Sequence, residues 1–323
     1  MTPQPPPVDP LEDLLATLDL EELGSARVSV QPREGSPDPA IELPETFAED
    51  ITLFRGQSQR QPHGRVFGGQ VLAQGVVASG RTVAATDPGR RLHSIHAYFM
   101  RPGDDTQPIT FSVERMRDGR SFSTRRVHAI QHGKPILSMS ASFQSPDGGL
   151  DHEDEMPDVP PAETLRSLAD VFAGVDDPRA KHLSRRAVEL RHVEGNIFAE
   201  PPAEASAYQH VWMRTVGSLP DDPLVHEAVL AYASDYSLLE TILRRHRLPW
   251  TTPGLKMASL DHAMWFHRPA RADDWVLYAQ SSPSAQSGRG LGIGRMFSAD
   301  GVLVASVAQE GMVRVPEGLT PRP

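Results

Sequence analysis

The chain has 323 residues, of which 39% are hydrophobic, and a formal net charge of −10. This charge argues against a protein that coats nucleic acid, because phosphate binding draws on clustered Lys and Arg side chains. The absence of cysteine excludes disulfides, thiolate metal sites and cysteine nucleophiles. No run approaches the roughly 20 apolar residues of a membrane span, and no signal-peptide pattern opens the chain. We therefore expect a cytoplasmic protein without stable membrane insertion.

The chain divides into five predicted segments. A proline-rich start is followed by leucines at helical spacing in "LEDLLATLDLEEL" and by an irregular linker over residues 24–47. Two ordered units are predicted at 48–145 and 185–316. Between them, 146–184 is rich in acid and proline, and we expect a connector with one short helix near "AETLRSLADVF". The N-terminal segment thus ends at residue 47, and residues 317–323 form a tail.

The two ordered units are an internal repeat. Arg101-Pro102 of the first unit recurs as Arg268-Pro269 in the second, and the turn residue Gly133 recurs as Gly301. In each unit one strand and one long apolar helix precede several strands with alternating polarity and glycine turns. The two predicted helices are "VFGGQVLAQGVVASGRTV" and "LVHEAVLAYASDYSLLETILRRH".

This order of elements predicts an α+β fold. A helix as apolar as "VLAQGVVASG" must be buried on most sides, and an antiparallel sheet wrapped around it achieves that. The arrangement is a hotdog, present twice. Two such units in one chain are expected to join their sheets edge to edge, since this pairs the exposed strands.

Several ordered blocks resemble the type II acyl-CoA thioesterases, the double-hotdog family of bacteria and peroxisomes. The blocks are "RVFGGQVLAQ", "LHSIHAYFMRPG", "GRSFSTRRV", "LAYASD", "SLDHAMWFHRP", "GRG" and "VASVAQEG". The resemblance implies hydrolysis of fatty acyl-CoA to free fatty acid and CoA, without a metal or organic cofactor. It also implies that Asp235, Ser259 and Gln309 hold the attacking water.

The residues around Asp235 agree with that role. A carboxylate in an apolar helical run is costly unless it is paired or hydrogen-bonded. We expect Asp235 to lie in mid-helix, because Asp222 and Pro223 form a start signal well before it. A helix cap is the alternative, purely structural explanation.

Asp261 and His262 follow Ser259 closely. On a regular strand Asp261 would share the side of Ser259, and His262 would point away from it. We therefore expect Ser259, and not the Asp261-His262 pair, to serve the chemistry. No metal site is expected, since the spacing of His262 and His267 does not suit a helical pair of ligands.

The substrate-binding residues proposed from sequence are of two kinds. Gly68 and Gly69, at the start of the first long helix, would permit close backbone approach to a ligand, or else tight packing. Arg120, Arg125 and Arg289 would contact the phosphates of CoA, with structural ion pairs as an equal alternative. In the first unit Leu92 occupies the position that corresponds to Ser259, and the helix has no carboxylate. We therefore expect one active site per chain. The first unit would serve as scaffold and part of the acyl tunnel.

Two other functions remain open from the sequence. One is an enoyl-CoA hydratase that uses Asp261 and His262, and the other is an acyl-CoA-binding protein without activity. In each case the expected partner is acyl-CoA, and we expect a homodimer or homotetramer that buries exposed sheet surface.

Overall fold

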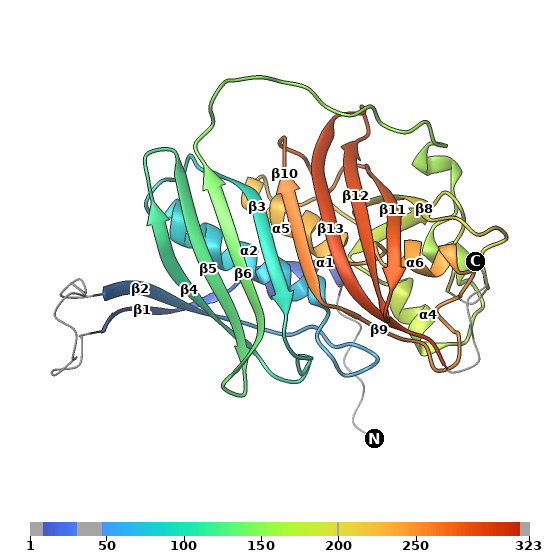
Figure 1. Ribbon diagram of the computed structural model, residues 1–323, viewed down its shortest axis with the longest axis horizontal. Coiled ribbons are helices and arrows are strands. Elements are labelled where there is room, and N and C mark those ends of the chain that lie inside the picture. Colours follow the sequence, from blue (N-terminus) through green and yellow to red (C-terminus); the bar gives the residue numbers. More distant parts are fainter. Residues whose placement is uncertain (1–8, 31–46, 199, 317–323) are drawn as a thin grey trace.

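The computed structural model describes residues 9–30, 47–198 and 200–316 (Figure 1). In this part of the chain, thirteen strands form one sheet in the order β1-β2-β4-β5-β6-β3-β10-β13-β12-β11-β8-β7, and β9 pairs with β13. The strands are β1 (Glu21–Val30), β2 (Phe47–Gly56), β3 (Arg91–Phe99), β4 (Ile109–Asp118), β5 (Phe122–Gln131), β6 (Lys134–Gln144), β7 (Val188–His192), β8 (Tyr208–Thr215), β9 (Lys256–Ser259), β10 (Asp261–Phe266), β11 (Val276–Gln286), β12 (Arg289–Ser298) and β13 (Leu303–Arg314). The helices are α1 (Pro10–Leu18), α2 (Gly68–Ala84), the 3₁₀ turn η1 (Ala162–Thr164), α3 (Leu168–Val171), α4 (Pro178–Leu183), α5 (Pro223–Ser234) and α6 (Glu240–Arg245).

The two units join through an antiparallel pair of strands in the middle of the sheet. β3 of the first unit pairs with β10 of the second, with Ile95 opposite Met264. Figure 1 shows both long helices, α2 and α5, on the same face of the curved sheet. The predicted double hotdog and its edge-to-edge joining are therefore confirmed.

Helices α2 and α5 cross antiparallel and in close contact. A Cβ added to Gly69, in the first turn of α2, would lie 2.3 Å from the backbone oxygen of Tyr232 near the end of α5. At the other end of the crossing, a Cβ on Gly80 would lie 2.4 Å from a methyl group of Leu224. Glycine at these positions lets the backbones approach, and α2 is buried along nearly its whole length. The crossing therefore fixes where α2 begins relative to where α5 ends.

The prediction that the second long helix is continuous is wrong. It breaks after Ser234, and residues 235–239 form turns before α6 begins. Hydrogen bonds there run from N–H groups to carbonyls three residues earlier, as from Tyr236 to Ala233 and from Glu240 to Ser237. Such bonds tighten the end of a helix. Asp235 is thus the C-cap residue of α5 and not a mid-helix residue, whereas Asp222 caps the start as expected.

The N-terminal segment and the connector contain more structure than expected. Strand β1 runs to Val30 and pairs with β2, so the first part of the predicted linker 24–47 is a strand. The expected helix after the proline-rich start is α1. The connector contains η1 and α3 where one helix was expected, and also α4. Residues 1–8, 31–46 and the tail 317–323 lie outside the described residues, and the domain boundaries stay a prediction.

The two glycines of the helix crossing should differ in what they tolerate. In Gly69→Ala the new methyl group meets a backbone carbonyl that cannot move alone, so we expect a loss of roughly 1–3 kcal/mol in the free energy of unfolding, as in other overpacked cores. In Gly80→Ala the methyl group meets the flexible end of Leu224, and the better helix propensity of alanine offsets about 1 kcal/mol. Urea denaturation of both variants measures the difference. Equal losses would contradict this account of the crossing.

Candidate active site

Three side chains from separate elements meet at the end of α5. The hydroxyl of Ser259, at the end of β9, donates to Asp235 Oδ1 across 3.1 Å. The amide Nε2 of Gln309, on β13, donates to Ser259 Oγ across 2.8 Å and also to Asp235 Oδ1. Gln309 is fully buried, whereas Asp235 and Ser259 keep partial exposure. The structure therefore brings together the three residues that the sequence singled out for the chemistry.

Ser259 lies opposite Gly311 of β13, two residues from Gln309, so these two side chains share a face of the sheet. An irregularity between β9 and β10 changes the alternation only after Ser259. Whereas Ser259 pairs with Gly311, Ala263 lies opposite Ala308. Three steps along β13 thus face four steps from β9 into β10, and Leu260 is the extra residue. A bulge of this kind shifts the alternation of side chains by one position.

His262 consequently points the other way from its expected direction. It is fully buried, and its Nε2 lies 2.9 Å from the hydroxyl of Ser234, the residue before Asp235. That hydroxyl donates its proton to the carbonyl of Ala231, so it accepts from His262, and Nε2 carries the hydrogen. Burial lowers the pKa of His262 to about 3. This neutral ring supports the end of α5.

Asp261 faces away from the buried ring. Its Oδ1 accepts the backbone N–H of Glu310 across 2.7 Å, on the opposite side of the sheet from His262. A carboxylate and an imidazole on opposite faces cannot act together as acid and base. The geometry gives no support to a dyad of Asp261 and His262.

The carboxyl group of Asp235 has an unusual proton affinity. Burial raises its pKa to about 6, although hydrogen bonds from Gln309, from Ser259 and from the backbone N–H of Gly69 oppose the rise. The N–H of Gly69 belongs to the first turn of α2, where free N–H groups and the helix dipole favour an anion. The group is therefore ionised near neutral pH but protonates readily below it.

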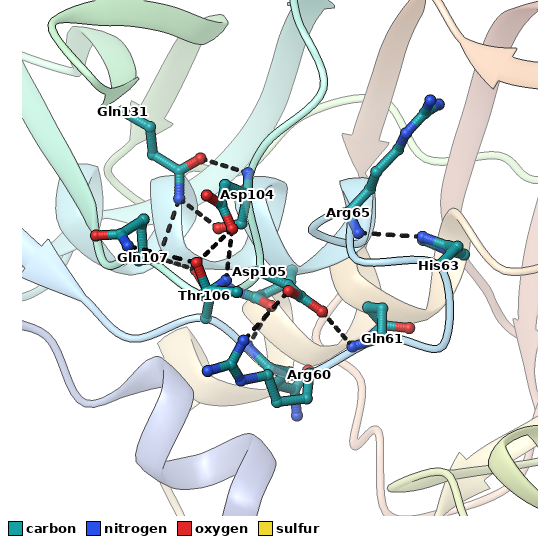
Figure 2. A network of polar contacts seen from close by, with 12 residues as sticks. Arg60, Gln61, His63, Arg65, Asp104, Asp105, Thr106, Gln107 and Gln131 are labelled. Atoms are coloured by element: carbon teal, nitrogen blue, oxygen red, sulfur yellow. Dashed lines mark hydrogen bonds and ion pairs between the residues drawn. The ribbon is translucent and has the colours of Figure 1, made fainter.

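The start of α2 is held by the loop before it. Asp105 is nearly fully buried and accepts the backbone N–H of Gln61 across 2.7 Å (Figure 2). It also pairs with Arg60 at 3.4 Å. Farther along the loop, Arg65 forms an isolated β-bridge with Asp104. These contacts fix the entry into α2, and so the position of the N–H that Asp235 accepts.

The turn after Asp235 is anchored by buried polar side chains. Gln280 donates to the hydroxyl of Ser237 across 2.7 Å. Glu240 accepts from Trp250 Nε1 at 2.9 Å and lies 3.3 Å from His192 Nε2. The sequence did not indicate these residues, because their polar types are common on surfaces and nothing in the chain order shows that they converge.

Gly68 and Gly69 lie at the candidate site, but they contact the protein. A Cβ on Gly68 would lie 2.6 Å from Asp235 Oδ2 and about as close to the ring of Phe99. Glycine at 68 therefore makes room for the carboxylate. Gly69 has two tasks, since it permits the helix crossing and donates its N–H to Asp235. Both glycines therefore permit tight packing, which was the alternative to approach of a ligand.

The three arginines proposed for the CoA phosphates do not gather at this site. Arg125 is fully buried, and its guanidinium donates to Thr82, to Asp118 and to two backbone carbonyls. It has no donor left for a phosphate. Thr82 lies fourteen residues from Gly68 along α2, about 21 Å at the helical rise of about 1.5 Å per residue.

The other two arginines are also placed elsewhere. Arg120 lies in the turn between β4 and β5, next to Arg90, which donates to its carbonyl. Arg289 pairs with Glu310 at 3.0 Å, and Glu310 points to the face of the sheet opposite Gln309. Structural roles therefore fit Arg125 and Arg289 better than phosphate binding.

The matching place in the first unit holds no polar trio. At the far end of the helix crossing, Leu224 packs against Gly80 of α2. Leu92 is buried, and Ala141 is buried on β6. Within the described residues no three His, Asp or Glu side chains gather as metal ligands. None of the helices in the same residues has the length and apolarity needed to cross a membrane.

The raised pKa of Asp235 predicts a pH-dependent cost in stability. A carboxyl whose pKa is higher in the folded state than in the unfolded state stabilises the fold when protonated, and that benefit is lost as pH rises from about 4 to above 6. From a shift of about two units we expect wild type to lose about 3 kcal/mol relative to Asp235→Asn across this window. Urea denaturation of both proteins at pH 4 and pH 8 measures this. A difference that does not change with pH would contradict the desolvation of the carboxyl group.

Known proteins resemble this chain over most of its length. The family described as acyl-CoA thioesterase matches residues 184–312, and the acyl-CoA thioesterase N-terminal domain matches residues 57–144. Acyl-CoA thioesterase 2 of Haemophilus influenzae is 41% identical over 83% of this chain and 94% of its own length. Human acyl-coenzyme A thioesterase 8 is 40% identical over 82% of this chain and 86% of its own. The crystal structure of an acyl-CoA thioesterase II from Mycobacterium marinum has 44% identity and a TM-score of 0.67, and the match covers 82% of this chain and 94% of that one. The chain therefore belongs to the type II acyl-CoA thioesterases, hydrolases of the double-hotdog fold.

Proposed function

We propose that the protein hydrolyses fatty acyl-CoA by direct attack of a water held by Asp235, Ser259 and Gln309. The observation that carries this proposal is the hydrogen-bonded meeting of the three side chains at the end of α5. Their types suit the task, because a carboxylate accepts a proton while a hydroxyl and a carboxamide orient a water molecule. The membership in the thioesterase family supports the choice of substrate.

The hydrogen-bonding capacity of the trio suggests how the water is oriented. Both donors of Gln309 Nε2 and the hydroxyl of Ser259 are used within the trio. Gln309 Oε1 is buried and has no donor among the described residues. A water molecule has two O–H groups, so it can donate one to Asp235 and the other to Gln309 Oε1. Its lone pair is then free to attack a carbon.

The reaction follows from this arrangement. The water oxygen bonds to the thioester carbonyl carbon as its proton passes to Asp235. The tetrahedral intermediate collapses, the carbon–sulfur bond breaks, and the CoA thiolate takes the proton back from Asp235. The products are a free fatty acid and CoA, and the carboxylate is regenerated. A general base contributes about 10²–10⁴-fold to such a step.

The role of Asp235 is tested by Asp235→Asn, which keeps the shape of the side chain. We expect release of free thiol from acyl-CoA to fall at least about 100-fold. The matched control is Glu227→Gln, which removes another carboxyl group of α5 whose burial raises its pKa to about 8. The control should keep near-wild-type activity. Unchanged activity in Asp235→Asn would remove Asp235 from the mechanism.

The pH dependence of the reaction gives an independent test. Asp235 must be ionised to accept a proton, and its pKa is about 6. We expect kcat/KM of wild type to rise with pH through about 6 and to level off above it. A profile measured from pH 4.5 to 9 that is flat, or that rises only above pH 7.5, would contradict Asp235 as the base.

The alternative hydratase activity finds no support in the placement of Asp261 and His262, as described above. A homodimer or homotetramer and a cytoplasmic location stay predictions.

A further inference from the structure

A group of basic side chains, two arginines and two histidines, lies outside the trio and has no role in the proposed chemistry. His63 and Arg65 belong to the loop before α2, His182 to α4, and Arg186 to the segment after α4. We call these four residues the basic cluster. Burial lowers the pKa of His182, and the charges of Arg186 and His63 lower it further. Desolvation, and after it the charge of Arg65, lowers the pKa of His63. Each histidine therefore lies within reach of the charge of an arginine.

Two aromatic rings connect the basic cluster to the candidate active site. The guanidinium carbon of Arg186 lies 4.1 Å from the ring centre of Tyr236, the residue after Asp235. Phe67 stacks against the same ring with centroids 4.9 Å apart and an interplanar angle of 14°. Phe67 precedes Gly68, which touches the carboxylate of Asp235. The cluster thus lies beside the carboxylate, beyond Tyr236 and Phe67, and does not contact it.

The cluster has little acid to balance it. The side chain of Arg186 forms no ion pair among the described residues, and its Nε is buried without a hydrogen-bond acceptor. The guanidinium of Arg65 extends away from the loop contacts and has no partner drawn in Figure 2. Asp105 is the carboxylate whose charge acts on His63, and it already binds Gln61 and Arg60. Arg65 and Arg186, which form no ion pair among the described residues, are notable in a chain with a net charge of −10, and they favour an anionic ligand.

We propose that the basic cluster binds the phosphate groups of CoA, an assignment that rests on the proposed thioesterase function. In acyl-CoA the pantetheine arm separates the thioester from the phosphates. Phosphate ligands should therefore lie near the catalytic carboxylate but apart from it, as this cluster does. Guanidinium groups bind phosphate through paired N–H donors. Arg186 is held in place by the ring of Tyr236, so little side-chain freedom is lost on binding.

The test compares two substrates that differ in these phosphates. Kinetics are measured with the acyl-CoA that wild type hydrolyses fastest and with the S-acyl-pantetheine of the same acyl chain, which has no phosphate. In Arg186→Gln we expect KM for acyl-CoA to rise about tenfold with little change in kcat, as for loss of one charge-assisted hydrogen bond. The kcat/KM for S-acyl-pantetheine should stay within about twofold of wild type.

Two further variants keep the test decisive. Arg65→Gln changes an exposed side chain, so the variant should fold normally and also raise KM for acyl-CoA alone. Arg185→Gln removes the same charge from an exposed neighbour of Arg186 outside the cluster, and it should leave both substrates unaffected.

Other outcomes would overturn the proposal. Equal losses with both substrates in Arg186→Gln, and none in Arg65→Gln, would mean that Arg186 only supports Tyr236. An equal rise of KM in Arg185→Gln would indicate general attraction of an anion in place of a site. If wild type hydrolysed neither substrate, the proposed function would fail instead, so the two failures are distinguishable.

Discussion

The buried carboxylate of Asp235 is the feature on which the site depends. Its desolvation is offset by donors from three elements: the first turn of α2, the end of β9 and the middle of β13. None of these donors is near Asp235 in sequence. The close crossing of α2 and α5 brings the first donor into place, and the pairing of β9 with β13 brings the second beside the third. A charge that is unfavourable for the fold is thereby kept where it can accept a proton.

The two units share one architecture but differ at this point. Gly69 lies against the backbone of α5 at one end of the crossing, and Gly80 lies against Leu224 at the other. Where the second unit has Ser259 and Gln309, the first has buried apolar residues such as Leu92 and Ala141. An apolar place of this kind adds to the core without the cost of burying polar groups. The first unit thus gains stability from apolar burial at the positions where the second unit holds the polar trio.

The sheet and the polar contacts around it have different tasks. The continuous sheet through β3 and β10 leaves no free strand edge between the units, so the two halves hold their positions relative to each other. The loop contacts of Asp105 and the buried contacts of Glu240 then fix the segments on either side of the helix crossing. A site built on such rigid elements keeps its geometry with little reorganisation.

The sequence by itself determined the repeat and the double hotdog, because period and turn residues are local properties of the chain. The trio was indicated by the resemblance of ordered motifs to a family. It could not determine side-chain directions that depend on pairing. The extra residue Leu260 reversed the expected direction of His262, and contacts with α2, β9 and β13 placed Asp235 at the end of a helix instead of inside one. The sequence also lists its arginines without their partners. Only the fold decided that Arg125 is paired inside the core and that Arg186 is not. The partners of a charged residue cannot be read from the sequence, since an ion pair joins residues that only the tertiary structure brings together.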